Sequence, residues 1–420
     1  MRSLIKRIAV DTSALGESRD FRLLTLGSVV TGFGTQAALV ALPYQVYVTT
    51  RSAFLTGLLG LVELGPLIAL SLFGGALADR FDRRRLLLMT QIALVAVALG
   101  LAATALDHKP PLWLLYVLAA ASAAASAVER VSRSAIVPNV VSAERLRGAL
   151  SLTFGLMQLT MVVGPAVGGV LIAAAGVKGA YIADAVSCAG MVAAAFAMGP
   201  QPPRGEPEDE EREPIFRSIA TGLRFVRGER ALVGSFAIDL CAMTFGMPRA
   251  LFPVLSLTVY HAGAAGTGAL FAAVAAGATV AALTTGWLEH ARWLGRIVLA
   301  AVAVWGLAIA LAGVTTSIVV ACVLLALAGA ADSVSAVCRS TISQTLTPDR
   351  LRGRMSSVFS LVVASGPRLG DVESGVVASV TTPRVSVVSG GVACIASVGL
   401  IAVLFPALAR YDGRKVVARA

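Results

Sequence analysis

Charged residues are scarce in this chain. Asp, Glu, Lys and Arg together make up 14% of its 420 residues, whereas 57% are hydrophobic and the mean hydropathy is +0.81. An average soluble domain carries about 25% charged residues, and a soluble protein as apolar as this one could not cover its surface with polar groups. The composition therefore excludes an ordinary soluble domain and predicts an integral membrane protein.

Cysteine and histidine are also few, and their spacing offers no metal centre. The five cysteines form no CxxC pair, and the three histidines form no HExxH pattern. The sequence also lacks a phosphate-binding loop of the form GxxxxGKS or GxxxxGKT. We therefore expect no metal, no cofactor and no ATP hydrolysis by this chain, which makes a membrane enzyme or sensor the weakest hypothesis.

Long apolar stretches dominate what is present. A helix needs about 20 mostly apolar residues to cross the hydrocarbon core, and twelve segments qualify. The sequence thus predicts an all-α membrane protein with spans near 22–48, 54–78, 86–106, 112–137, 150–175, 179–198, 232–258, 265–288, 297–314, 317–343, 355–380 and 385–408.

The positions of the basic residues predict the orientation of these spans. If both termini are cytoplasmic, 26 of the 35 basic residues lie on the cytoplasmic side and four in outer loops. Basic residues favour that side of the membrane. This distribution also explains the net charge of +11 without nucleic-acid binding. Only four lysines and abundant Ala and Val are typical of a GC-rich bacterial genome, so we expect a bacterial inner (plasma) membrane protein.

A polar stretch divides the chain in the middle. The Pro- and Glu-rich segment 200–214 cannot bury itself, and the following sequence up to residue 231 predicts a helix with an apolar stripe. That helix either lies at the inner membrane surface or is an ordinary connector. We expect an N-terminal six-helix bundle over 1–199, a cytoplasmic linker over 200–231 and a C-terminal six-helix bundle over 232–420.

The two predicted bundles repeat each other. The sequence SRSAI at 132–136 matches CRSTI at 338–342, SAERLRG at 142–148 matches TPDRLRG at 347–353, and GPAVGG at 164–169 matches GPRLGD at 366–371. The offsets are 206, 205 and 202 residues, in the same order. Two repeated bundles around a central cavity are the plan of many secondary transporters, so the repeat predicts transport by alternating access.

A charged loop follows the second span. The segment GALADRFDRRRLL at 75–87 resembles the signature loop of the major facilitator superfamily, over the positions Gly75, Asp79, Arg80, Arg83 and Arg84. Asp82 replaces the second glycine of that pattern, and aspartate tolerates a left-handed turn better than most residues. The resemblance covers essentially the whole chain.

A second motif points to the direction of transport. Gly164, Pro165, Gly168 and Gly169 are similar to the end of the superfamily's antiporter signature, although Ser151 and Thr160 replace its upstream glycines. More narrowly, the segments at 245–253 and 347–359 resemble the enterobactin-exporter and macrolide-efflux branch. The resemblance implies export of a small molecule, driven by the proton gradient.

The signature loop allows two interpretations. Its arginines can act only as a topology anchor, because moving them across lipid is costly. The resemblance adds a conformational switch, in which Asp79 pairs with Arg83 and latches the cytoplasmic ends of the spans.

Several ionisable residues fall inside predicted spans, where charge is expensive and usually functional. Glu63 and Asp239 are the leading proton or substrate carboxylates, and Asp332 is a further candidate. Each can instead hydrogen-bond a neighbouring helix without ever titrating. Asp184 ranks lower because it lies close to the outer surface.

Two closely spaced pairs complete the candidates. Arg368 with Asp371, three residues apart, and Glu129 with Arg133, four residues apart, can each share a helical face. Each is either a structural ion pair or a pair that responds to substrate or protons. Two further arginines have simpler interpretations: Arg249 snorkels outward or lines a break in the seventh span, and Arg339 anchors the cytoplasmic end of the tenth.

The leading hypothesis is thus a monomeric twelve-span antiporter that exports a small amphipathic molecule, a drug-like compound or a siderophore-like metabolite, against protons. The alternative keeps the fold but reverses the task, as a symporter or uniporter that imports a small nutrient. The expected partners are the substrate, protons and the lipid bilayer.

Overall fold

A computed structural model describes residues 15–16, 18–107, 109–202, 215–348 and 351–413. Within these ranges, the side chains at 71–80, 215–220, 222, 289–290, 352–354, 356–358 and 360 lie outside the description. The chain forms two compact units. Unit 1 comprises Met1–Gln45 and Gly65–Glu208, and unit 2 comprises Val46–Leu64 and Asp209–Ala420.

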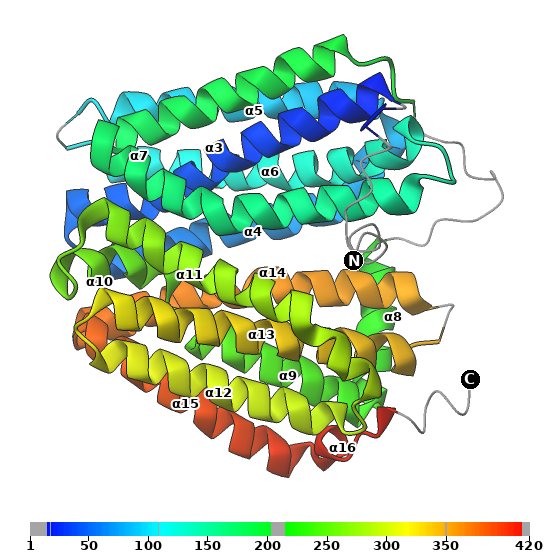
Figure 1. Cartoon of the computed structure of the whole chain (residues 1–420), viewed down its shortest axis with the longest axis vertical. Helices are drawn as coiled ribbons and strands as arrows, with labels where there is room; N and C mark the ends of the chain where they lie inside the picture. The colour runs from blue at the N-terminus through cyan, green and yellow to red at the C-terminus, as the bar shows by residue number, and fades with distance from the viewer. Residues whose placement is uncertain (1–14, 17, 108, 203–214, 349–350, 414–420) are drawn as a thin grey trace, which may run out of the picture. The chain divides into compact units, whose positions relative to one another are not determined.

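Helices build both units, and no strand occurs among the described residues (Figure 1). The helices before the central linker are α3 (Arg19–Thr50), α4 (Ala53–Arg80), α5 (Arg83–Thr104), α6 (Leu112–Val140) and α7 (Leu146–Ala197). The later elements are α8 (Ile215–Gly228), α9 (Arg230–Phe245), η1 (Arg249–Leu251), α10 (Phe252–Thr258), α11 (Gly263–Thr284), η2 (Thr285–His290), α12 (Leu294–Val314), α13 (Ile318–Leu346), α14 (Arg352–Val380), α15 (Pro383–Leu404) and α16 (Pro406–Ala409).

Ten helical stretches in the described part of the chain are long and apolar enough to cross a membrane. Twelve spans were expected, and the difference has two local causes. The predicted fifth and sixth spans form one 52-residue helix, α7, whose dihedral angles leave the helical region at Gly176 (φ 67°, ψ 179°). The predicted eleventh span, α14, is not among the ten.

Small residues bring α7 close to α3 inside unit 1. A Cβ atom at Gly164 would lie 2.6 Å from the Cβ of Gln36, and one at Gly168 would lie 2.7 Å from the Cα of Ala37. Both distances are too short for any side chain larger than hydrogen. Close approach through small residues is the usual means of helix packing in membranes, so the antiporter-like motif forms the α3–α7 contact.

The same principle joins α11 and α13 in unit 2, which run side by side in Figure 1. A Cβ at Gly277 would collide with the carbonyl oxygen of Ala326, and a Cβ at Gly329 with that of Val274. The two glycines therefore let each backbone touch the other.

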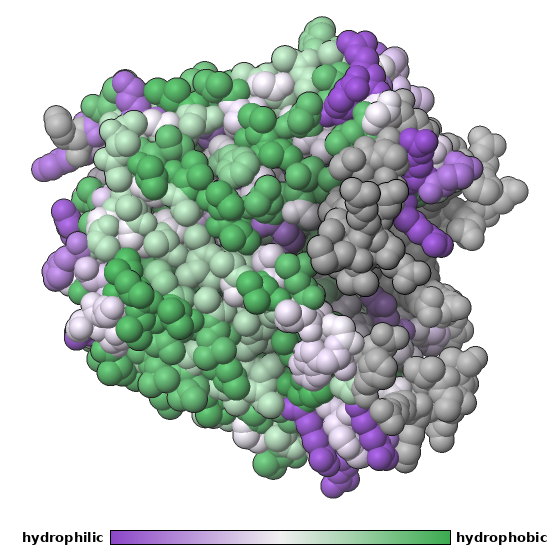
Figure 2. Space-filling model, in the orientation of Figure 1, coloured by the Kyte–Doolittle hydropathy of each residue, from purple (hydrophilic) through white to green (hydrophobic). Residues whose placement is uncertain are grey.

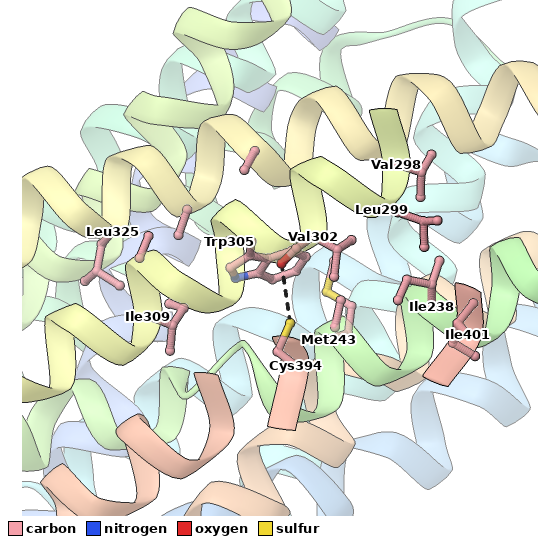
Figure 3. Packing of buried hydrophobic residues seen from close by; sticks show 14 of the residues in the cluster. Ile238, Met243, Val298, Leu299, Val302, Trp305, Ile309, Leu325, Cys394 and Ile401 are labelled. Atoms are coloured by element: carbon pink, nitrogen blue, oxygen red, sulfur yellow. Dashed lines mark hydrogen bonds between the residues drawn. The ribbon is translucent and has the colours of Figure 1, made fainter. Parts of the chain in front are cut away.

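An apolar core fills the middle of unit 2. Trp305 of α12 is 1% exposed and lies near Met243, Val302 and Cys394, which come from α9, α12 and α15 (Figure 3). Its indole nitrogen donates a hydrogen bond to the carbonyl oxygen of Gly246 at 2.9 Å. The bond satisfies a carbonyl at the point where α9 ends.

On the face shown in Figure 2, hydrophobic residues cover much of the surface of both units, and hydrophilic residues gather toward the helix ends. Large exposed side chains such as Leu283, Val403 and Phe196 would be unfavourable in water. In a bilayer they face a solvent as apolar as themselves. The chain is a multi-pass membrane protein.

Candidate functional site

Two carboxylates and one guanidinium group meet inside unit 2. Arg339 of α13 donates a hydrogen bond through NH1 to Oδ1 of Asp239 in α9, and its NH2 lies 3.7 Å from Oδ1 of Asp332, two turns earlier on the same face of α13. The side chains of Asp239 and Arg339 are 1% and 3% exposed, and that of Asp332 is 23% exposed. We call these three residues the acidic triad.

The prediction that Arg339 is an anchor at the helix end is wrong. Its side chain points toward α9, because Asp239 of α9 lies beside it at the same level along the helices. Asp239 lies nine residues after Arg230, roughly 14 Å along the helix, and an arginine buried at such depth requires a partner. The sequence offered one usable signal: Asp332 and Arg339 are seven residues apart, two helical turns on one face.

A second charged group lies where α4, η1 and α14 meet in unit 2. NH2 of Arg368 is 3.7 Å from Oε2 of Glu63, and NH2 of Arg249 is 3.5 Å from Oδ2 of Asp371. Asp371 also accepts a hydrogen bond from the backbone N–H of Ala250 at 3.0 Å. We call these four ionised side chains the charged quartet. They are 14–30% exposed and carry two charges of each sign.

Arg368 and Asp371, which were expected to share a helical face, each have a charged partner on another element. NH1 of Arg368 turns back to the carbonyl oxygen of Ala364 at 3.0 Å, while Asp371 faces η1. Arg368, the partner of Glu63, comes within reach because α4 has a glycine, without a side chain, where it meets α14. A Cβ at Gly60 would lie 2.6 Å from the carbonyl oxygen of Arg368.

The seventh predicted span is broken, as one interpretation of Arg249 required. Helix α9 ends at Phe245, and α10 begins only at Phe252, with η1 between them. Pro248 precedes η1 and lacks the N–H that would continue a helix. The break presents the N–H of Ala250 and the guanidinium of Arg249 to Asp371.

In unit 1 the pair predicted from spacing is in contact. Nε of Arg133 lies 3.4 Å from Oε1 of Glu129, both on α6. Arg133 and Arg339 occupy matching positions in the sequences SRSAI and CRSTI. Arg133 pairs along its own helix, whereas Arg339 joins two helices.

The arginines of the signature loop cap helix ends in unit 1. NH1 of Arg83 donates to the carbonyl oxygen of Ala135 at 2.8 Å and to Oδ1 of Asn139 at 3.2 Å, both in α6. Arg84 donates to the carbonyl oxygens of Ala195 and Phe196, both at 2.8 Å. The last carbonyls of a helix lack intrahelical donors, so the bonds from Arg84 satisfy the end of α7, while those from Arg83 tie the signature loop to the last turns of α6.

Asp82 does not adopt the left-handed turn that its place in the motif suggested. Its φ is −55°, and it is the N-cap of α5, with Oδ1 accepting a hydrogen bond from the N–H of Arg85 at 3.0 Å. Its Oδ2 accepts from the N–H of Gln201 at 2.9 Å, and the N–H of Arg83 donates to the Gln201 carbonyl at 3.0 Å. These bonds form a clamp, made of Asp82, Arg83 and Gln201, that holds the chain after α7.

The clamp gives a direct prediction. Replacing Asp82 with alanine removes both the cap and the bond to Gln201, and loss of an N-cap costs about 0.5–2 kcal/mol. We expect a lower unfolding temperature for the purified variant in detergent. Asp82→Asn keeps an acceptor for the Arg85 N–H and should lose less. Equal unfolding temperatures for Asp82→Ala and the unchanged protein would contradict the role of the clamp.

Some predicted positions lie outside the described residues. The surroundings of Gly75 and the side chains of Asp79 and Arg80 belong to this group, as do residues 203–214 of the polar segment 200–214. The Asp79–Arg83 latch therefore stays a prediction. Val226 of α8 packs into the core of unit 2. In the described part of the chain, no group of three or more His, Cys, Asp or Glu side chains could hold a metal ion.

Comparison with known proteins shows the family to which the chain belongs. A family model described as "Transmembrane secretion effector" matches residues 13–419. The chain is a transmembrane secretion effector of the major facilitator superfamily. This membership confirms the resemblance found in the sequence, and it makes the chain a transport protein rather than an enzyme.

Curated members of the family are similar over most of their length. The chain is 30% identical to the enterobactin exporter EntS of Shigella boydii serotype 4 (strain Sb227) over 354 residues, which cover 84% of this chain and 83% of the relative. It is 29% identical to EntS of Escherichia coli O139:H28 (strain E24377A / ETEC) with the same coverage.

Solved structures share the fold. The nucleoside transporter NupG matches with a TM-score of 0.74 at 12% identity, covering 92% of this chain and all of that one. A bacterial homologue of the human lysosomal transporter Spinster matches with a TM-score of 0.69 at 15% identity, covering 95% of this chain and 97% of that one. At such identities the likeness concerns the fold alone, and it agrees with an all-helical transporter of this superfamily.

Proposed function

We propose that this secretion effector is a secondary active exporter of a siderophore, or of a similarly small amphipathic compound, that works by proton antiport without any cofactor. The similarity to enterobactin exporters over 84% of the chain carries the proposal. The absence of a nucleotide-binding motif from the sequence favours an ion gradient as the energy source. Export distinguishes this function from the import of a nutrient.

The transport cycle we propose uses twelve spans. Helix α7 counts as two spans that meet at Gly176, and α9 and α10 together form one. Helix α14 is 29 residues long but carries Arg368, Asp371 and Glu373, which lower its apolar content. Counted in this way, the helices give six spans on each side of the linker, with both termini cytoplasmic.

Matching glycine contacts support two repeated halves. In unit 1, Gly164 and Gly168 bring α7 against α3. In unit 2, a Cβ at Gly366 would lie 2.6 Å from the Cβ of Met243, and a Cβ at Gly370 would lie 2.5 Å from its carbonyl oxygen, so these glycines bring α14 against α9. The two pairs are 202 residues apart. Such repeats are how many secondary transporters achieve alternating access.

The test uses enterobactin as the probe. A bacterium that makes enterobactin but lacks its own exporter should release it into the medium when it expresses this chain, and retain it with an empty vector. Inverted membrane vesicles should take enterobactin up when a proton gradient is imposed and stop when a protonophore collapses the gradient. Release no greater than with the empty vector would refute siderophore export, and accumulation inside intact cells would favour import.

The signature loop gives a prediction for the same assay. Asp79→Asn removes the charge proposed to pair with Arg83 while leaving the topology-setting arginines in place. We expect lower export with unchanged amounts of membrane-inserted protein, measured by immunoblotting of membranes. Asp107→Asn, in the loop at the opposite end of the spans, is the matched control and should export normally. Normal export by Asp79→Asn would leave the loop as a topology anchor alone.

A further inference from the structure

The three clusters of ionisable side chains within the spans differ in their net charge. The charged quartet contains two acids and two bases, and Glu129 with Arg133 contains one of each. The acidic triad contains two acids and one base, so its net charge is −1 when all three side chains are ionised. A buried negative charge without a counter-ion is costly in an apolar environment. Binding one proton would make the triad neutral.

Along α9, α11, α12 and α13, the further charged side chains are Arg230 and Arg296, each in the first turn of its helix. Helix α11 has no ionisable side chain, and α12 has only Arg296, near its first turn. Helix α9 adds Arg230 at its first residue and the thiol of Cys241, and α13 adds the thiols of Cys322 and Cys338. Apolar side chains such as Ile238 and Ile342, both 0% exposed, and the buried Ser335 are further neighbours along these helices.

The two carboxylates of the triad are held unequally. Asp239 accepts a hydrogen bond from Arg339, whereas the 3.7 Å from Arg339 to Asp332 exceeds hydrogen-bonding distance. Oδ1 of Asp332 and Oγ of Ser335 have no hydrogen-bond partner among the described residues. Asp332 is also the most exposed of the three, and ionisable residues within spans usually face the bundle interior or a water-filled cavity.

We propose that Asp332 is the proton-binding residue of this chain, with Arg339 as its counter-ion and Asp239 as the carboxylate that keeps Arg339 in place. A proton from water adds to a carboxylate oxygen of Asp332, one O–H bond forms, and the triad changes from −1 to neutral. Release to water on the other side of the membrane reverses the step. The use of this proton in transport rests on the antiport proposed above, whereas the protonation itself does not.

Other acids within spans lack this combination. Glu63 and Asp371 already have their arginines in the charged quartet. Asp184 is 8% exposed, and its Oδ1 accepts a weak bond from the thiol of Cys188 at 3.7 Å. Neither Asp184 nor Glu373 forms an ion pair among the described residues, so protonating either would release no cation. Protonation of Asp332 instead removes one of the two negative charges beside Arg339. Arg339 is also the residue that joins α13 to Asp239 of α9.

The first test needs no substrate. Infrared difference spectra of the chain in lipid vesicles, recorded on acidification, should show the carbonyl stretch of a carboxylic acid that appears within the membrane. We expect Asp332→Asn to lose one such band and Glu63→Gln, Asp184→Asn and Glu373→Gln to keep it. If the band persists in Asp332→Asn, the assignment is overturned. The absence of any such band in the unchanged protein would overturn it as well. If Asp332→Asn does not fold, Asp332→Glu should shift the band in frequency and in the pH at which it appears, and an unshifted band would overturn it.

The second test measures transport of enterobactin into vesicles with the membrane potential clamped. For a one-proton exchange, a gradient of one pH unit drives about tenfold accumulation. Asp332→Asn should lose this accumulation, down to the level without a gradient, but keep exchange of enterobactin at equal pH. Loss of both activities would indicate a structural role and overturn the proposal. An unchanged protein that exchanges enterobactin but ignores the gradient would refute antiport itself, while the infrared result would still decide whether Asp332 binds a proton.

Discussion

Arg339→Met is expected to destabilise the protein by about 3–5 kcal/mol, because removing one partner of a buried ion pair leaves the other charge unpaired. Here two carboxylates would lose their shared cation, and Asp239 is 1% exposed. The variant should give little monodisperse protein in detergent and a strongly lowered unfolding temperature. Methionine keeps the length and apolar stem of the side chain, so the missing charge is the main change.

Two further variants test this explanation. Adding Asp239→Asn to Arg339→Met removes one of the unpaired charges and should restore part of the stability. Arg133→Met breaks the corresponding pair in unit 1, where the arginine and Glu129 are 24% and 10% exposed, and a more solvated pair contributes less. If Arg339→Met unfolds at the same temperature as the unchanged protein, the triad does not hold α9 to α13.

Gly277→Ala is expected to cost about 1–3 kcal/mol, the usual penalty for overpacking. The new methyl group would meet the carbonyl oxygen of Ala326 in α13. Because that atom belongs to the backbone, no side-chain rotation can make room, and the two helices must separate. Gly329→Ala, at the reciprocal contact with Val274, should have a similar effect on the unfolding temperature.

The control is a glycine in open space. A Cβ at Gly399 of α15 would meet nothing within 4 Å, and alanine favours a helix over glycine by up to about 1 kcal/mol. Gly399→Ala should therefore unfold at the same temperature as the unchanged protein or slightly above it. Equal behaviour of Gly277→Ala and Gly399→Ala would show that α11 and α13 do not depend on close backbone contact.

The helices were predictable because their signals are local. The span predicted at 297–314 corresponds to α12, Leu294–Val314, since an apolar run bounded by polar residues needs no knowledge of its neighbours. Gly176 was harder: it falls between two predicted spans, yet the chain passes through it with one non-helical residue, and hydropathy cannot distinguish a sharp kink from a loop.

The partners of the charged side chains were less predictable. Spacing along one helix indicated Glu129 with Arg133, which are in contact. Asp239 and Arg339 are 100 residues apart and Glu63 and Arg368 more than 300, so their meeting depends on which helices are neighbours and which faces they share. Arg368 and Asp371 show the converse, since good spacing on one helix did not prevent each from taking a partner elsewhere.

The clamp at Asp82 has a practical consequence for making this protein. It ties Gln201 to the start of α5, and Arg84 ties down the last turn of α7, so the N-terminal portion is anchored up to the point where the polypeptide leaves it. A cut between there and α8 would leave the end of α7 held by these bonds. Co-expression of the two pieces from separate genes, split inside 203–214, is thus a feasible route to labelling each piece with isotopes on its own.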